Sequence, residues 1–375
     1  MRSAVEWVES LTPWPEEFGL RRMRALLDRL GAPQLAYPSI HVVGTNGKTT
    51  TVRMTEALLA GEGLAVGAYT SPHVTGWGER IRLGGEEADF ERALQRVRPL
   101  AEELEATQFE ALTAAALAAF AEAEVDAAVV EAGLGGRLDA TNVLRSPVQV
   151  LTNVALEHTE HLGETREAIA REKLAVVQAG ATVVLAEPEW EALARANGAG
   201  RVVLVSRSNL ALAAAAAEAF LGRPVATRPA EELQVPGRLE RVGERPLEIW
   251  DGAHTLDAVG YVLARLPRRR WTLVLSILAD KDVDRLLAAF SALGDHVVAT
   301  QSANSRALPA PELARRAERF FPRVEAVDDP VHALFRAREA AGEEGAVLVS
   351  GSLYLLASLA AVRTASVPWE SSESD

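Results

Sequence analysis

The chain of 375 residues contains no cysteine. This absence excludes disulfides, cysteine-ligated zinc, iron–sulfur clusters and thiol catalysis. The formal net charge of −13 argues against a protein that binds nucleic-acid phosphates and against a polybasic membrane anchor. No apolar run approaches the ~20 residues that span a bilayer, and the first residues lack the apolar core of a signal peptide. We therefore expect a cytoplasmic protein that binds neither nucleic acid nor membrane, and we take a monomer as its expected state.

Lysine is also scarce. Of the 39 Lys and Arg residues, only Lys48, Lys173 and Lys281 are lysines. Where arginine serves as the general cation, lysine is expected at positions that need a compact ammonium or an amine able to react. Chance survival of three surface lysines is the alternative interpretation. Two of the three lie in the motifs described below, which favours the functional one.

Apolar runs and helical patterns alternate along the chain with short links. Runs typical of buried strands occupy residues 39–43, 64–69, 125–130, 148–154, 181–186, 201–206, 247–250, 271–277, 296–300 and 346–350. Helical spacing predicts helices at 17–31, 49–59, 90–105, 111–124, 165–178, 210–220, 283–293, 311–320 and 330–341. This alternation predicts an α/β protein with parallel sheets that are covered by helices on both faces.

A change of composition marks a boundary inside the chain. Residues 228–238 contain Pro229, Pro236 and Gly237, which is typical of a connection between domains. We therefore predict one domain at residues 1–235 and a second at residues 236–375. The polar tail at residues 371–375 is expected to be disordered.

The strongest motif is Gly44-Thr45-Asn46-Gly47-Lys48-Thr49-Thr50, between a predicted strand and a predicted helix. In that context the backbone N–H groups and the helix N-terminus would cradle phosphates, and Lys48 would reach the β and γ oxygens. Val42 stands where the usual first glycine would be, so this is a variant P-loop. A glycine turn that merely caps a helix is the alternative.

Other polar residues follow predicted strands of the first half. Glu131 comes directly after the run 125–130, where it would hold Mg²⁺ through oxygen, although a strand-end acid is often only solvated. The glycine-rich stretch 133–142 adds polar residues that include Asp139. His158 follows the strand 148–154 and is a candidate metal ligand or hydrogen-bond donor, whereas a lone loop histidine usually has no such role. Lys173 lies on the next predicted helix.

The second half shows the same arrangement. Asp251 and His254 follow the strand 247–250, Arg238 lies in the connection, and Lys281 lies between two aspartates after the strand 271–277. Each residue alone could belong to a simple turn. Together they place polar groups at strand ends in both domains, which favours a site in a cleft between the domains.

Taken in order, these motifs resemble the folylpolyglutamate synthase and dihydrofolate synthase family within the Mur ligase superfamily. The resemblance covers nearly the whole chain. Further segments that carry it are Phe18-Gly19-Leu20, Leu30–Gln34, Thr70-Ser71-Pro72-His73, Phe109–Thr113, Gly135–Asn142, Leu162-Gly163, Pro236–Glu240 and Gly351–Leu355. It implies a P-loop-type parallel-sheet domain that binds ATP and a smaller Rossmann-like C-terminal α/β domain.

The resemblance also implies an activity, namely ATP-dependent joining of L-glutamate to a folate or dihydropteroate carboxylate through an acyl phosphate. By resemblance, Ser71, Glu131 and His158 match ligands of Mg²⁺, and Lys173 matches a lysine that is carbamylated in this superfamily. Lys48 matches the phosphate lysine, so that Lys48, Lys173 and His158 form the implied catalytic set. The positions that match ATP contacts outside the P-loop are Asn209, Arg238, Asp251 and His254.

Three departures from the family pattern leave alternatives open. Thr49-Thr50 replaces the usual Gly-Ser, which favours a related Mur-type ligase that acts on another carboxylate and amine. Thr255-Leu256 replaces Asn-Pro, which favours a nucleotide-binding paralogue without ligase activity. Glu157 stands where the family has Asp. The choice between dihydropteroate and tetrahydrofolate as acceptor stays open, and Lys281 has no assigned role.

Overall fold

The computed structural model describes residues 2–15 and 17–363, so the tail at 371–375 lies outside the described residues. Two compact units divide the chain. Unit 1 comprises the residues up to Pro72 and Gly76–Leu233, and unit 2 comprises His73–Thr75 and the chain from Gln234 onward. The three residues 73–75 therefore belong to unit 2, although they interrupt unit 1 in the chain. No sequence pattern predicts this excursion.

Unit 1 is built on a sheet that contains eight strands among the described residues, in the order β4-β3-β2-β5-β1-β6-β7-β8. Its strands are β1 (Ser39–Val43), β2 (Val66–Tyr69), β3 (Ile81–Leu83), β4 (Glu86–Glu87), β5 (Ala127–Glu131), β6 (Val148–Leu151), β7 (Thr182–Leu185) and β8 (Arg201–Leu204). The six strands from β2 to β8 in this order pair in parallel. The α/β class with a parallel sheet is thus confirmed for this unit.

One edge of that sheet differs from the prediction. Strand β3 pairs antiparallel with β2, and β4 pairs antiparallel with β3. The pair Gly84-Gly85 lies between β3 and β4, and such a dipeptide closes a tight hairpin. The sequence predicted neither strand, because both are too short to show as apolar runs.

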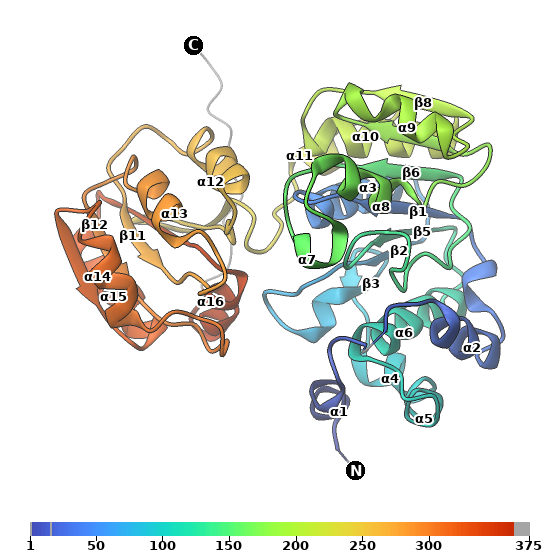
Figure 1. Ribbon diagram of the computed structural model, residues 1–375, viewed down its shortest axis with the longest axis horizontal. Coiled ribbons are helices and arrows are strands. Elements are labelled where there is room, and N and C mark those ends of the chain that lie inside the picture. The colour runs from blue at the N-terminus through green and yellow to red at the C-terminus, as the bar shows by residue number, and fades with distance from the viewer. Residues whose placement is uncertain (1, 16, 364–375) are drawn as a thin grey trace. The chain divides into compact units, whose positions relative to one another are not determined.

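Helices cover both faces of the sheet in unit 1. They are α1 (Ala4–Ser10), α2 (Arg21–Arg29), α3 (Lys48–Gly61), α4 (Phe90–Gln95), α5 (Arg98–Glu103), α6 (Gln108–Glu122), α7 (Thr159–Leu162), α8 (Arg166–Leu174), α9 (Glu191–Ala196), α10 (Asn209–Leu221) and α11 (Arg228–Glu231). Helices α3, α10 and α11 pack on one face. On the other face, α1, α2 and α4–α6 form one core and α8 and α9 form a second (Figure 1). Short 3-10 turns at Pro33–Leu35, Trp77–Arg80 and Pro188–Trp190 complete the unit.

Three segments of unit 1 differ from the prediction. The helix predicted at 90–105 is split into α4 and α5, because Pro99 lies in the first turn of α5 and has no N–H to continue the ladder from α4. The helix predicted at 17–31 begins only at Arg21, after Gly19, whose cost in a helix is about 1 kcal/mol. The connection predicted at 228–238 includes the short helix α11, which packs against α3.

Unit 2 has six strands among its described residues, in the order β13-β12-β11-β14-β10-β9. They are β9 (Glu240–Glu244), β10 (Leu247–Trp250), β11 (Thr272–Leu275), β12 (His296–Ala299), β13 (Arg323–Ala326) and β14 (Ala346–Ser350). All neighbours are parallel except the edge strand β9, which pairs antiparallel with β10. The parallel core agrees with the prediction. Strands β9 and β13 were not predicted because neither contains an apolar run.

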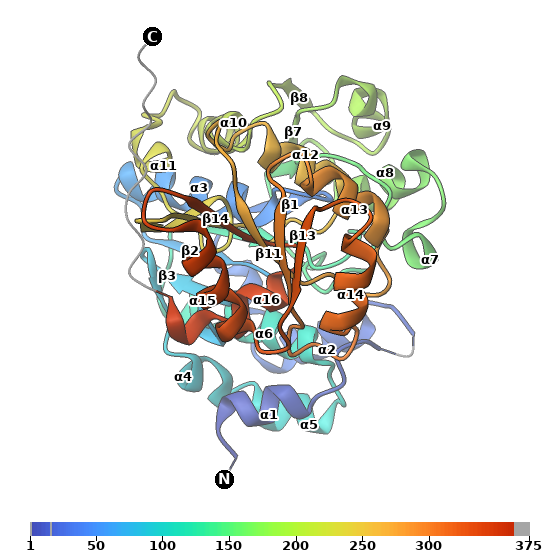
Figure 2. The same ribbon diagram turned by 90° about the vertical axis from the view of Figure 1, so that its left-hand side faces the viewer.

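The helices of unit 2 also cover both faces of its sheet. They are α12 (Leu256–Leu263), α13 (Val283–Phe290), α14 (Ala310–Ala317), α15 (Pro330–Ala341) and α16 (Leu353–Ser358), and a 3-10 turn follows at Ala360–Val362. Helices α12–α14 pack on one face, and α15 and α16 pack on the other (Figure 2). Val74, from the excursion 73–75, packs with the second group. No helix in the described part of the chain is long and apolar enough to cross a membrane.

Candidate active site

The loop 44–50 connects β1 to α3, at the carboxyl edge of the parallel strands. Two of its glycines are required by their surroundings. Gly44 has φ +148°, and a Cβ there would stand 1.9 Å from Thr152 Oγ1. Gly47 has φ +80°, and a Cβ there would stand 2.5 Å from Asn209 Oδ1. The predicted nucleotide residue Asn209, the first residue of α10, therefore lies directly against the loop.

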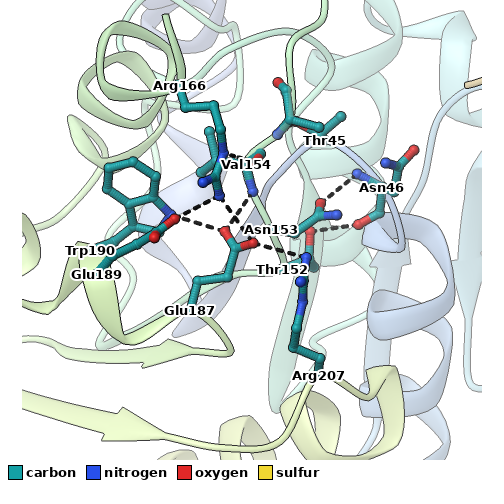
Figure 3. A network of polar contacts seen from close by, with 11 residues as sticks. Thr45, Asn46, Thr152, Asn153, Val154, Arg166, Glu187, Glu189, Trp190 and Arg207 are labelled. Atoms are coloured by element: carbon teal, nitrogen blue, oxygen red, sulfur yellow. Dashed lines mark hydrogen bonds and ion pairs between the residues drawn. The ribbon is translucent and has the colours of Figure 1, made fainter. Parts of the chain in front are cut away.

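The segment 152–155, which follows β6, holds the first half of the loop (Figure 3). Thr45 N donates to Asn153 O at 3.0 Å, and Asn46 N donates to Asn153 Oδ1 at 2.8 Å. Thr152 Oγ1 donates to Asn46 O at 2.7 Å. Two loop N–H groups that the sequence assigned to phosphate are thus engaged within the protein. The N–H groups at the first turn of α3, which have no acceptor within a helix, are left to face an anion.

Lys48 begins α3 and folds back over the loop. Its Nζ donates to Gly44 O at 3.0 Å and to Thr45 O at 3.2 Å. The side chain is half-buried, and Thr50 lies half-buried on the same first turn. The ammonium group is therefore held at the mouth of the loop, where a phosphate bound to the helix N-terminus would meet it.

Glu131 ends β5 and joins three segments. Its carboxylate, in a residue only 2% exposed, accepts hydrogen bonds from Thr49 Oγ1 at 2.9 Å and from Ser71 N at 3.1 Å. The predicted ligands Ser71 and Glu131 are thus brought together, beside the loop. Carboxylate and hydroxyl oxygens are the donors that Mg²⁺ prefers, so this group fits the ion.

His158 lies on the loop between β6 and α7. It has φ +44° and precedes the short helix α7, and its Nδ1 lies 3.9 Å from Glu160 Oε1. Its side chain is 42% exposed. Two of the three predicted metal ligands, Ser71 and Glu131, are thus in direct hydrogen-bond contact.

Lys173, on α8, is almost fully buried, with 1% of its side chain exposed. Its Nζ donates to Gly44 O at 2.8 Å and to Glu157 Oε1 at 2.8 Å. Burial lowers the pKa of Lys173 to about 8, against the opposing attraction of Glu157. Burial also acts to raise the pKa of Glu157, but the nearby ammonium groups of Lys173 and Lys48 outweigh it and leave that pKa below its usual value.

The glycine-rich stretch 133–142 is fixed from within. Asp139 accepts hydrogen bonds from Leu134 N at 2.8 Å and Thr141 N at 3.0 Å, and the Thr141 hydroxyl donates to it as well. Thr141 Oγ1 lies 2.8 Å from Nε2 of the buried His41 on β1. Burial raises the pKa of Asp139 and lowers that of His41 to about 4. The polar residues of this stretch therefore serve first to tie it to β1.

Of the predicted residues of unit 2, Asp251 and Arg238 lie close enough to interact electrostatically. Asp251, after β10, accepts hydrogen bonds from Leu239 N and Ala253 N, each at 2.8 Å. Burial raises its pKa to about 6, against the attraction of the Arg238 guanidinium. His254 Nδ1 lies 2.8 Å from Gly252 O. Lys281, by contrast, lies 3.4 Å from Asp280 Oδ2, which also has Arg306 at 3.8 Å.

Sequence reasoning missed two groups that shape the loop. Asn153 has no motif that would single it out. Glu187 comes directly after the predicted run 181–186, as Glu131 comes directly after the run 125–130, so the rule that selected Glu131 would also have found it. Glu187 accepts hydrogen bonds from Val154 N at 2.9 Å and Trp190 Nε1 at 2.9 Å (Figure 3).

Comparison with known proteins agrees with this geometry. Residues 42–234 match the Mur ligase middle domain, and residues 237–353 match the Mur ligase, glutamate ligase domain. The dihydrofolate synthase/folylpolyglutamate synthase of Mycobacterium tuberculosis is 35% identical over 82% of this chain and 80% of that protein. The enzyme of the same name from Escherichia coli is 31% identical over 95% of this chain and 94% of that protein.

Solved structures lead to the same family. E. coli FolC in complex with DHPP and ADP matches with a TM-score of 0.87 and 30% identity, over 96% of this chain and 97% of that one. The bifunctional folylpolyglutamate synthase/dihydrofolate synthase of Yersinia pestis, complexed with AMPPNP and Mn ion, matches with a TM-score of 0.87 and 30% identity, over 96% and 98%. The chain therefore belongs to the dihydrofolate synthase/folylpolyglutamate synthase family of Mur ligases.

Proposed function

We propose that this protein is an ATP-dependent ligase that joins L-glutamate to a folate-type carboxylate. The observation that carries the proposal is the loop 44–50 with Lys48 at its mouth and Glu131 beside it, in a chain of this family. The substrate carboxylate would attack the γ-phosphorus of ATP, forming an acyl phosphate and releasing ADP. The glutamate amine would then attack the acyl carbon, so that an amide forms, phosphate leaves and the amine loses a proton.

The residues of the loop have a direct part in the first step. Phosphoryl transfer needs positioning and charge neutralisation more than covalent help from the protein. The first turn of α3 would receive the phosphates, and the Lys48 ammonium would stabilise the negative charge that shifts toward the β-phosphate as ADP leaves. Asn209, in contact with Gly47, would limit how deeply the nucleotide enters.

The oxygen donors beside the loop support a divalent cation. We assign Ser71, Glu131 and His158 to Mg²⁺. When bound, Mg²⁺ neutralises phosphate charge and acts as a Lewis acid. The Thr49 hydroxyl, which donates to Glu131 at 2.9 Å, would orient that carboxylate toward the ion.

Lys173 is assigned to the carbamylated position of the superfamily. Its lowered pKa, about 8, supports the assignment because the neutral amine is the form that reacts with carbon dioxide. The two acceptors at its Nζ, Gly44 O and Glu157 Oε1, oppose it because they stabilise the ammonium. Carbamylation therefore requires that the ion pair with Glu157 opens.

We assign Arg238, Asp251 and His254 of unit 2 to contacts with ATP outside the P-loop. The departure at Thr255 has a structural account, since its side chain accepts a hydrogen bond from Ala258 N at 3.3 Å and caps α12. We also propose units 1 and 2 as the ATP-binding and C-terminal ligase domains. A monomer that acts in the cytoplasm, where ATP and glutamate are present, completes the proposal.

The test is a steady-state assay of ADP release by the purified protein. We expect release that requires both L-glutamate and either dihydropteroate or tetrahydrofolate. Assaying each acceptor separately decides which one is used. Release only with peptidoglycan-type acids and amines would replace the proposal by a related Mur-type ligase. ATP binding without release across the whole panel would replace it by an inactive paralogue.

A further inference from the structure

Both ends of the segment 152–155 are hydrogen-bonded to the loop 44–50. Beside the bonds of Thr152 and Asn153 described above, Ala155 N donates to Thr45 Oγ1 at 3.1 Å. The position between them, Val154, makes no such bond to the loop. What holds Val154 therefore holds the three residues that contact the loop.

An acid and a base secure the backbone of Val154 on both sides. Val154 N donates to Glu187 Oε2 at 2.9 Å, and Arg166 Nε donates to Val154 O at 2.9 Å. Arg166 also lies 3.3 Å from Glu187 Oε1, so the two side chains that hold Val154 are themselves an ion pair (Figure 3). A displacement of Val154 along either direction would break one of these bonds.

Glu187 is the centre of this arrangement. Its side chain is only 8% exposed, and it has two further donors, Trp190 Nε1 at 2.9 Å and Arg207 at 3.0 Å. Oε2 receives Val154 and Trp190, whereas Oε1 receives Arg166 and Arg207. Arg207 is two residues before Asn209, which contacts Gly47. The carboxylate thus connects the segment 152–155 with the approach to α10.

We propose that Glu187 is a positioning residue for nucleotide binding, acting through Val154 and the segment 152–155 on the loop 44–50. The inference rests on the proposed function, because it assigns the loop to ATP. Glu187 need not touch the nucleotide. Without its carboxylate, the buried N–H of Val154 has no acceptor, and the segment that fixes Thr45 and Asn46 is free to shift. The loop would then bind phosphate less tightly while the reacting groups stay intact.

Unit 2 offers a matched control in Glu248, on β10. Glu248 is 2% exposed and also holds a tryptophan and an arginine: Trp250 Nε1 donates to it at 2.7 Å, and Arg338 donates at 2.7 and 3.0 Å. These bonds connect side chains within unit 2. Removing this acid should lower stability without reshaping the loop 44–50.

The test compares Glu187→Leu, Glu187→Gln and Glu248→Leu, each checked to be folded at the assay temperature. For Glu187→Leu we expect the KM for ATP and the Kd for ADP to rise at least about tenfold, the effect of one buried N–H left unpaired, with kcat within about threefold. Glu187→Gln keeps an acceptor for Val154 N and should stay within about threefold of wild type. Glu248→Leu should leave both constants within about twofold.

The outcomes separate the two claims. If wild type binds no ADP, the proposed function fails and this inference falls with it. If wild type binds ADP and Glu187→Leu binds it equally well, only the inference is overturned. An equal rise in Glu248→Leu would also overturn it, because general destabilisation would then explain the effect. Should Glu187→Leu not fold, the half-exposed Arg166→Met decides: a rise of about threefold or more in the Kd for ADP supports the inference, and an unchanged Kd contradicts it.

Discussion

The carboxyl ends of the parallel strands carry different groups in the two units. In unit 1, four neighbouring strands contribute to one place: β1 leads into the loop 44–50, β5 into Glu131, β6 into the segment 152–155 and β7 into Glu187. In unit 2, one strand, β10, leads into Asp251, which is fixed by two backbone N–H groups and faces Arg238. Unit 1 thus builds its site from the ends of four strands, and unit 2 from one strand end and the segment just before β9.

The difference suggests that the two units have different roles in the reaction. A site whose parts hold one another, as Lys173 and Thr152 hold the loop in unit 1, is preorganised for the developing charge of a reaction. A single strand end such as Asp251 suits the binding of a ligand that has already been positioned. We therefore expect substitutions of the unit 1 lysines Lys48 and Lys173 to affect the chemical step, and substitutions in unit 2 to affect mainly nucleotide affinity.

The largest effect is expected at Lys48. Lys48→Ala should lower kcat by about 10²- to 10³-fold, as removal of one group that stabilises transition-state charge does. Lys48→Arg should lose most activity as well, because a planar guanidinium does not replace a compact ammonium at this mouth. Steady-state rates of ADP release measure both. Near-normal activity of Lys48→Ala would remove the distinction between the units.

Lys173 comes next. Lys173→Ala should be about 10²-fold less active, and short-chain carboxylates such as acetate should restore part of the rate if a carbamate is the working group. Lys173→Arg should show no such restoration, because its charge is permanent. Incorporation of isotopically labelled bicarbonate into wild type, followed by NMR, detects the carbamate itself. Full activity of the alanine variant without added carboxylate would contradict the assignment.

A smaller effect is expected in unit 2. Arg238→Ala should raise the KM for ATP by about tenfold, the value of one charge-assisted contact, while kcat stays within about threefold. Initial rates over a range of ATP concentrations separate the two constants. A loss of kcat as large as that of Lys48→Ala would show that the two units share the chemical step equally.

The last expected effect is on stability rather than activity, and it concerns the titration of Asp251. Its folded-state pKa, about 6, exceeds the usual 3.8, so the folded protein binds more protons than the unfolded chain between these values. Stability from this group is therefore present at low pH and is lost as pH rises through about 6. The advantage of wild type over Asp251→Asn in unfolding free energy should be larger at pH 4.5 than at pH 7, by about 2 kcal/mol. Urea unfolding at both values measures it, and a constant difference would refute the raised pKa.

The sequence predicted those parts of the fold that have strong local signals. Strands β1 and β5 are buried over their whole length and appear as apolar runs, and the loop 44–50 between a strand and a helix is a motif. Strand β13 has exposed ends and β4 has two residues, so neither shows a pattern. The excursion 73–75 depends on packing of Val74 in the core of unit 2, which no local pattern encodes.

The site was predictable to the same degree. Lys48, Glu131 and Ser71 stand in motifs, and the structure brings them to one edge. The motif predicts that the N–H groups of Thr45 and Asn46 bind phosphate. It does not show that both groups donate to Asn153 instead. Asn153 lies more than a hundred residues away in the chain, so only the fold brings it to the loop.

The central claim is that the loop 44–50 of unit 1 binds the phosphates of the nucleotide. Hydrogen–deuterium exchange of the whole protein, with and without ADP and Mg²⁺, tests it most directly. The account predicts that ADP slows amide exchange in peptides covering residues 44–50 in wild type, and that the same subsaturating ADP concentration slows it less in Lys48→Ala. Slowed exchange confined to unit 2, or equal slowing in Lys48→Ala, would contradict the account.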